Sequence, residues 1–316
     1  MSSQIKNCYR GRAVRPLKPQ DWCDRLMNLR EQERKSARIF LVGMCAFLAL
    51  ILGFPTIANI WFSFNDVTFH NLTGEGYSGL ANYREALSNP KLWEALGYSL
   101  KFGVICTVFE VGFALLLVFI LHPLLLRRPW LTAIIMMPMM VSPALMGVMY
   151  RLVLNEFVGI VPGYLDMIGV TMNFLSLKHI QFTVIAIEVL QWTPFAFLIL
   201  LTARQSLPYD LEEAAAVDGA TGMRLNIMVV LPLITPAIII VSFIRFIDSF
   251  RVFDHIFVLT GGGPGNSTTS LSIYIYKLFF KQNDLGPAVA LSMTLLIASL
   301  AFLYFGLKLA VRRNDR

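Results

Sequence analysis

The sequence is poor in charge, has few and irregularly spaced cysteines, and contains no Gly-Lys dipeptide. Charged residues make up 15% of the 316 positions, well below the roughly one quarter that is typical of soluble globular chains. The four cysteines show no paired spacing, so neither a disulfide framework nor a zinc site is expected. A P-loop needs Gly-Lys to hold nucleotide phosphates. The chain therefore lacks such a site, and we expect it to bind no cofactor itself.

Long apolar runs take the place of charge. About 20 apolar residues cross the hydrocarbon core of a bilayer. Four runs of at least 20 residues carry no charge: Ile39–Asn65, Pro129–Tyr150, Leu225–Ile244 and Leu285–Leu307. Two further runs each contain one acid, Glu110 or Glu188. We therefore predict an all-α membrane protein with a transmembrane domain over 39–311 and six spans, at about 39–64, 102–126, 130–150, 180–203, 230–250 and 286–309.

Basic residues are unevenly divided between the loops that these spans define. Of 27 Lys and Arg, eighteen fall on one side, in the arm 1–38, near residues 127–128, in 204–224 and after 307, and eight fall in the opposite loops. The positive-inside rule then places both termini in the cytoplasm. The net charge of +7 reflects this asymmetry and gives no reason to invoke nucleic acid.

The arm 1–38 precedes the first span. The expected first span is too long for the apolar region of a signal peptide and lies behind this polar arm, so no cleavable signal is expected. Trp22, Leu26, Met27 and Leu29 recur at roughly helical spacing among basic residues. This pattern predicts an interfacial helix on anionic membrane lipid.

The loop 205–232, between the fourth and fifth spans, has the pattern of a helix, a bend and a second helix. Pro208 suits a first helical turn, and the acids that follow favour the positive end of the helix dipole. Gly219 permits a bend, Thr221 can cap the second helix, and Pro232 can open the fifth span. One face of the first helix carries Leu211, Ala214, Ala215 and Asp218. The loop suits docking into a cytoplasmic partner, although an ordinary solvated loop stays open on these grounds.

The same loop resembles a known motif. Glu213-Ala214-Ala215, then Gly219 after three residues, Val229 after nine more, and Leu231-Pro232 resemble the EAA motif of ABC importer membrane subunits, with Val229 where that family prefers Ile. Further stretches resemble carbohydrate-uptake permeases of the maltose type: "FDHIFVLTGGGPGNST" at 253–268, "GLANY" at 79–83 and "LQWTPFAF" at 190–197. The resemblance runs from about residue 39 and is closer to the MalF-like than to the MalG-like member of the permease pair.

The resemblance implies a MetI-like, maltose-type bundle of six core helices with a cytoplasmic coupling helix, in the bacterial inner membrane. The partners that it implies are a second, MalG-like permease subunit, a dimeric cytoplasmic ATPase that holds ATP and Mg, a periplasmic solute-binding protein and a sugar. Glu213 would pair with a basic residue of the ATPase, Ala214 and Ala215 would pack in its cleft, and Gly219 would make the bend beside Asp218. The chain would be a transport subunit and not an enzyme.

Four charged residues lie in or near expected spans. Inserting a charged side chain at the centre of a bilayer costs about 2.5–3.5 kcal/mol of free energy, so such groups usually face a cavity or one another. Glu110 is either partnered or snorkelling. In the maltose-type family, sugar contacts come from the helices before and after the EAA loop. By position, this resemblance implies a substrate pathway of Glu188, Gln191, Trp192, Phe195, Arg245, Asp248 and Ser249.

Two questions stay open at this level. The maltose-type family is largely neutral at these places, so Arg245 departs from its pattern. Arg245 either binds an anionic group of the solute or forms an internal salt bridge with Asp248 or Glu188. Gly261–Gly265 forms either a periplasmic turn that touches the binding protein or a flexible loop. The alternative functions are an importer for another solute, such as a polyamine, an ion-coupled carrier, and a membrane enzyme. No internal repeat favours the carrier, and the four scattered histidines do not favour the enzyme.

Overall fold

A computed structural model describes residues 35–68, 71 and 76–314. The interfacial helix expected near residues 22–29 lies outside these residues. The chain divides into two compact units, Met1–Ala58 and Asn59–Arg316. A helix over Lys35–Ser63 is apolar and long enough to cross a membrane. It contains a π-helical turn at Ala49–Gly53 and ends as α2, Phe54–Ser63.

Four further membrane-length helical segments lie in the second unit, and the described residues hold five in all. They contain α4 (Pro90–Arg127), α8 (Ile180–Gln205), α11 (Leu231–Phe250) and α14 (Leu285–Asn314). In a bilayer every backbone N–H and C=O must be bonded internally, so apolar runs of this length become helices. The remaining elements of this unit are short: α3 (Ala81–Ser88), α5 (Trp130–Met136), η2 (Met137–Met140), α6 (Pro143–Val153), α7 (Ile160–Met167), α9 (Tyr209–Val217), α10 (Gly222–Leu225), η3 (Asn226–Val230), α12 (Asp254–Thr260) and α13 (Leu271–Lys281).

Helix α4 starts well before the charge-poor run that announces it. The side chain of Asn89 accepts a hydrogen bond from the backbone N–H of Lys91 at 3.1 Å, and Pro90 occupies the first helical turn. An Asn cap followed by proline is a strong helix start. The helix therefore begins twelve residues before position 102, where the expected span begins.

The third expected span, 130–150, is not one continuous helix. The segments Trp130–Met140 and Pro143–Val153 meet at an angle of 82°. The break falls at Val141 and Ser142, immediately before Pro143, which has no N–H to continue a helical ladder. The amide of Gln191 on α8 donates to the carbonyl oxygen of Val141 at 2.8 Å and so satisfies the opened backbone.

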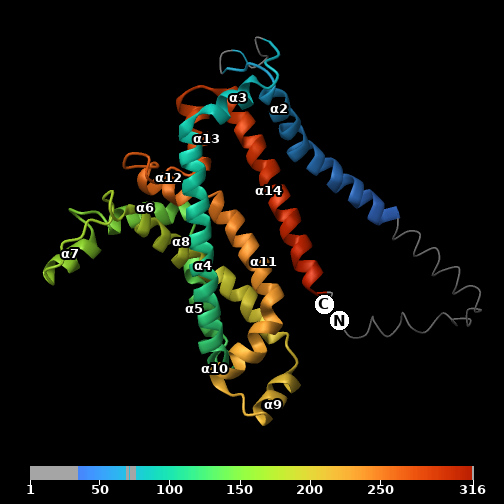
Figure 1. The fold of residues 1–316 in the computed structure, drawn as a ribbon, viewed down its shortest axis with the longest axis vertical. Coiled ribbons are helices and arrows are strands. Elements are labelled where there is room, and N and C mark those ends of the chain that lie inside the picture. Colours follow the sequence, from blue (N-terminus) through green and yellow to red (C-terminus); the bar gives the residue numbers. More distant parts are fainter. Residues whose placement is uncertain (1–34, 69–70, 72–75, 315–316) are drawn as a thin grey trace, which may run out of the picture. The chain divides into compact units, whose positions relative to one another are not determined.

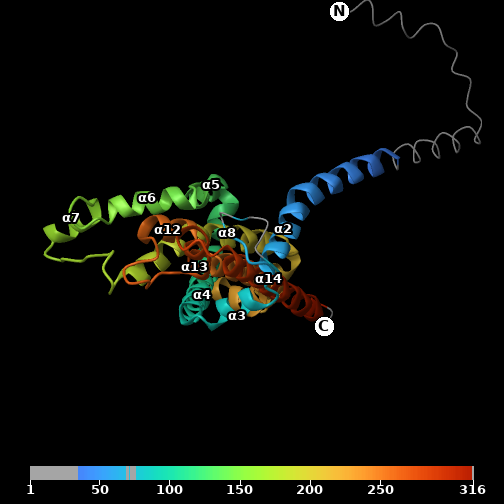
Figure 2. The same ribbon diagram turned by 90° about the horizontal axis from the view of Figure 1, so that it is seen from above.

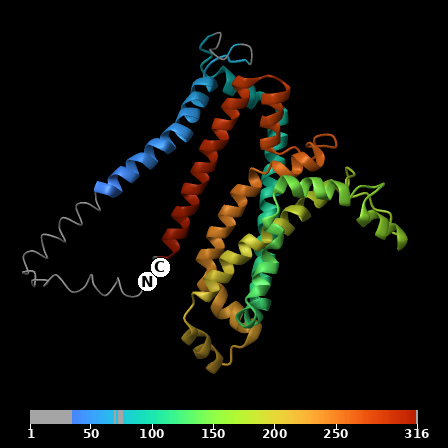
Figure 3. The ribbon, with the colours of Figure 1, turned by 180° about the vertical axis from the view of Figure 1, so that it is seen from behind.

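Helices α4, α8 and α11 pack along one another and form the centre of the second unit (Figure 1). Small residues such as Ala114 and Ala196, both 0% exposed, allow the helix backbones to approach closely. Seen from behind, α9 lies at one end of this bundle and α13 lies at the other (Figure 3). Seen from above, α5, α6 and α7 extend to one side of it (Figure 2).

Candidate functional site

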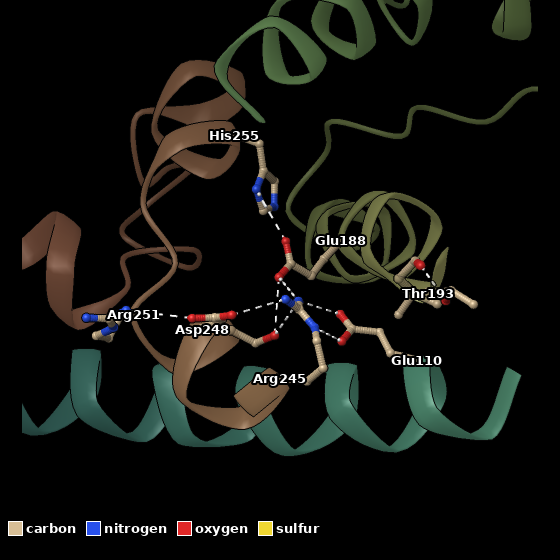
Figure 4. A network of polar contacts seen from close by, with 9 residues as sticks. Glu110, Glu188, Thr193, Arg245, Asp248, Arg251 and His255 are labelled. Carbon is tan, nitrogen blue, oxygen red and sulfur yellow. Dashed lines mark hydrogen bonds and ion pairs between the residues drawn. The ribbon is translucent and has the colours of Figure 1, made fainter. Parts of the chain in front are cut away.

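A buried network of charges joins the three central helices (Figure 4). Arg245 on α11 is 0% exposed. It donates from Nε to Glu110 Oε2 at 2.6 Å and from a terminal nitrogen to Glu110 Oε1 at 3.2 Å. The same nitrogen lies 3.2 Å from Glu188 Oε1 on α8, and the other lies 3.5 Å from Asp248 Oδ2. One guanidinium therefore binds carboxylates from α4, α8 and its own helix.

Glu188 has one saturated and one open oxygen. Its Oε1 accepts from Arg245 and from the hydroxyl of Ser249, each at 3.2 Å. Its Oε2 is buried and has no hydrogen bond among the described residues. The Nδ1 atom of His255, on α12, lies 3.5 Å from Oε2. Glu188 therefore retains one buried acceptor that has no hydrogen bond, beside the ring of His255.

The network is also a structural clamp. Taking charges out of water is repaid only where pairing geometry and hydrogen bonds are good, and removing one partner of a buried pair costs about 3–5 kcal/mol. Both Glu110 and Arg245 are fully buried, and their two-point contact has the fork geometry that an arginine favours. The clamp holds α4, α8 and α11 in one arrangement at the level of Glu188.

A half-open cavity of about 370 Å³ lies against this network. Its wall carries three carboxylates, one arginine and one indole: Glu188, Asp248, Asp254, Arg251 and Trp192. Asp248 is an exposed member, with 44% of its side chain accessible, and it also contacts Arg251 at 3.6 Å. The Arg245 guanidinium carbon lies 4.6 Å from the centre of the Trp192 ring, which is a cation–π distance.

A larger cavity of about 630 Å³ lies along the first half of α4 and is lined in part by Lys91, Lys101 and Lys277. It does not include Glu188, Arg245 or any other member of the charge network. We therefore place the candidate solute site at the smaller cavity, where buried charges, an aromatic ring and an open acceptor meet.

The structure separates the expected pathway residues into two groups. Glu188, Trp192 and Asp248 line the cavity. Gln191 is 0% exposed and binds the Val141 carbonyl, and Arg245 and Ser249 are fully buried behind the wall. Phe195 packs edge-on against Trp192, with ring centres 6.5 Å apart. The internal salt bridge is therefore the role that Arg245 has in this structure.

Two members of the network were missing from the residues expected for the pathway. Glu110 lies 135 positions from Arg245 in sequence, and His255 was one of four scattered histidines. One signal for Glu110 was present, since a buried intramembrane acid needs a counter-ion and Arg245 is the only arginine inside an expected span. No comparable signal in the sequence points to His255.

The loop between α8 and α11 forms the expected helix, bend and helix. Helix α9 begins after Pro208, and Gly219 has φ = +79°, a left-handed conformation that glycine adopts most readily. Pro232 lies in the first turn of α11. Thr221 precedes α10 but makes no side-chain cap. Glu213, Ala214, Asp218 and Gly219 are exposed, whereas Ala215 is 8% exposed and covered by its own chain.

These features define a membrane transport subunit: apolar helices around buried charges, with a helix–bend–helix exposed at one end. Residues 102–314 match the family described as "Binding-protein-dependent transport system inner membrane component". The chain belongs to this family. It is therefore an inner-membrane permease subunit of a binding-protein-dependent importer and not an enzyme, as the EAA motif predicts. Among the described residues, no group of three or more His, Cys, Asp or Glu side chains is placed to hold a metal ion.

Two relatives and one solved structure illustrate the similarity. The chain is 32% identical over 290 residues to the trehalose/maltose transport system permease protein MalF of Thermococcus litoralis, covering 91% of this chain and 97% of the relative. It is 29% identical to the trehalose transport system permease protein SugA of Mycobacterium tuberculosis, covering 88% and 90%. A bacterial ABC transporter that imports the acidic polysaccharide alginate has the same fold, with a TM-score of 0.77 at 20% identity, covering 90% of this chain and 99% of that one.

Proposed function

We propose that this permease subunit carries a sugar or sugar derivative across the inner membrane. The relatives at about 30% identity that are named for trehalose and maltose transport support this substrate class. The proposed assembly contains a MalG-like second permease, a dimeric ATPase that holds ATP and Mg, and a periplasmic solute-binding protein. Both termini and the loop 205–232 are cytoplasmic in this proposal, in line with the distribution of Lys and Arg.

The single observation that carries the proposal for the site is the pairing of an indole with an open carboxylate oxygen. Arg245 lies over one face of Trp192, and in this proposal a sugar ring stacks on the other face. Glu188 Oε2 lacks a donor, and a sugar hydroxyl is a donor of the right kind. Both side chains lie on the wall of the same cavity. We assign Glu188, Trp192 and Asp248 to direct solute contact, and Gln191, Phe195, Arg245 and Ser249 to the support of that wall.

The charges on the cavity wall favour a neutral solute over an anionic one. Three carboxylates face one arginine, and Arg245 has its donors engaged by Glu110, Glu188, Asp248 and Ser249. An anionic sugar would meet like charge at this wall. The same excess of carboxylates makes a cationic solute such as a polyamine the second candidate.

The proposed coupling site is the exposed face of α9 and the bend after it. Glu213, Ala214, Asp218 and Gly219 are accessible in the isolated chain. An ATPase cleft that carries a basic residue would pair with Glu213, and the small side chain of Ala214 would admit a close approach. Ala215 supports this face from within, because it is buried against its own chain.

An uptake assay on the reconstituted importer tests the solute proposal. Trp192→Ala is expected to raise the KM for trehalose or maltose by about tenfold, the effect of losing a stacking contact of about 1.4 kcal/mol. Trp130→Ala is the matched control, since Trp130 is 58% exposed at the start of α5 and is not one of the residues that line the cavity. Competition by spermidine that exceeds competition by either sugar would favour the polyamine importer. Equal KM values for Trp192→Ala and wild type would refute the assigned sugar contact.

A further inference from the structure

One backbone carbonyl of α4 has no donor within the helix and accepts a hydrogen bond from a residue of the loop 205–232 instead. Pro123 lies inside α4 and has no N–H, so the carbonyl of Phe119, four positions earlier, lacks its normal helical donor. The side-chain amide of Asn226 in η3 donates to this oxygen at 3.3 Å. Asn226 is 6% exposed. A side chain from the loop 205–232 thus replaces the backbone donor that α4 lacks at this point.

Asn226 is itself bound by a buried arginine. Arg204 lies in the last turn of α8 and is 5% exposed. One of its terminal nitrogens donates to the Asn226 side-chain oxygen. Its other terminal nitrogen lies 3.6 Å from Glu212 Oε1. Glu212 belongs to α9 and directly precedes Glu213, the first residue of the motif that faces the proposed ATPase.

A continuous polar chain therefore joins the coupling helix to two central helices. It runs from Glu212 on α9 to Arg204 on α8, then through Asn226 to the Phe119 carbonyl on α4. Helix α8 runs without interruption from Arg204 to Glu188, with Pro194 inside it, a distance of about 24 Å at 1.5 Å per residue. A displacement of α9 that is transmitted to Arg204 reaches the cavity wall through this helix.

We propose that Arg204 and Asn226 are positioning residues that transmit movement of α9 to α8 and α4. This inference rests on the proposed function, in which a separate ATPase moves α9. This role requires the two terminal nitrogens of a guanidinium, because Arg204 binds Asn226 and Glu212 at the same time. Lysine has the charge without the planar fork, so Arg204→Lys is expected to couple poorly.

The test uses the complete complex with its ATPase and reads the movement of α8 directly. A reporter, Leu198→Cys, lies on α8 at 36% exposure, in a background where Cys8, Cys23, Cys45 and Cys106 are serine. ATP with Mg is expected to change its maleimide labelling rate about fivefold or more in the parent, within the usual range of coupling between sites. Arg204→Gln is expected to reduce that change to less than twofold while the ATPase stays bound. Arg128→Gln, which removes the same charge from an exposed residue just beyond α4, is expected to keep it.

A second pair of variants separates transmission from simple stability. Asn226→Leu removes the donor to the Phe119 carbonyl, whereas Pro123→Ala restores an N–H that can bond this oxygen within α4. The double variant is expected to regain thermal stability but not the ATP-dependent labelling change, because Arg204 still lacks Asn226. Recovery of both together would overturn the inference and leave a purely structural role. An unchanged labelling response in Arg204→Gln would overturn it too. A parent chain that binds no ATPase would instead overturn the proposed function itself.

Discussion

The buried ion pair between Arg245 and Glu110 gives the most quantitative prediction. Arg245→Gln leaves the carboxylates of Glu110 and Glu188 buried without a cation, since their side chains are 0% and 3% exposed. Loss of one partner from such a site costs about 3–5 kcal/mol. Glu110→Gln is expected to be much milder, about 1 kcal/mol, because an amide oxygen can still accept from Arg245 and Glu188 still supplies a counter-charge.

The double variant Glu110→Gln/Arg245→Gln is the critical comparison. It removes one of the two orphaned carboxylates, so we expect it to be more stable than Arg245→Gln alone, although it carries one more substitution. The assay is thermal unfolding of the purified protein in lipid nanodiscs. A loss of about 3 kcal/mol corresponds to a fall in Tm of roughly 6–12 °C for a protein of this size class.

The control for this series is Arg251→Gln. Arg251 also contacts a carboxylate, Asp248, but its side chain is 52% exposed, and exposed pairs contribute little to stability. Its Tm is expected to match wild type. If Glu110→Gln were as damaging as Arg245→Gln, or the double variant less stable than Arg245→Gln, the description of the network as a guanidinium shared by excess carboxylates would be refuted.

Three further substitutions test other parts of the account. Gly219→Ala puts a side chain at φ = +79°, with nothing within 4 Å of the added carbon. The backbone cost of about 1 kcal/mol should weaken retention of the ATPase in a pull-down. Undiminished retention would contradict the role of the bend. Gly147→Ala places a methyl group 2.9 Å from the His255 carbonyl oxygen. The clash should push α6 away from α12 and lower the Tm by several degrees. An unchanged Tm would argue against this packing. Asn82→Ala removes donors to the Ser63 and Asn65 carbonyls, each at 3.0 Å, and should cost about 1–3 kcal/mol in chemical unfolding. Asn89→Ala, at a partly exposed position, should reproduce this effect only in part.

Much of the helical framework follows from the sequence because its cause is local. Uninterrupted apolar length predicts a membrane helix, and α8 and α11 correspond closely to the expected spans 180–203 and 230–250. The helix, bend and helix of the loop 205–232 were predictable for the same reason, since Pro208, Gly219 and Pro232 each act on their own stretch of backbone. The angle of 82° near Pro143 was not, because a hydropathy pattern carries no information about the direction in which a helix continues after a break.

The ion network shows where local reasoning ends. The contact between Arg245 and Asp248 is three residues apart on one helix and could be proposed from spacing alone. The stronger contact, with Glu110, depends on how α4 and α11 pack. The link from Asn226 to the Phe119 carbonyl is hidden in the same way, although Pro123 announces that this carbonyl needs a donor. Sequence indicates which groups require partners, and tertiary packing decides which partners they obtain.

The central claim is that this chain moves solute only when a separate ATPase acts on the loop 205–232. Uptake of radiolabelled trehalose or maltose into proteoliposomes, with the solute-binding protein and ATP supplied on their proper sides, tests it most directly. The account predicts accumulation when both permease subunits and the ATPase are present, and none when the ATPase is omitted or when Glu213→Arg prevents its docking. Accumulation by this polypeptide alone, without ATPase or ATP, would contradict the account.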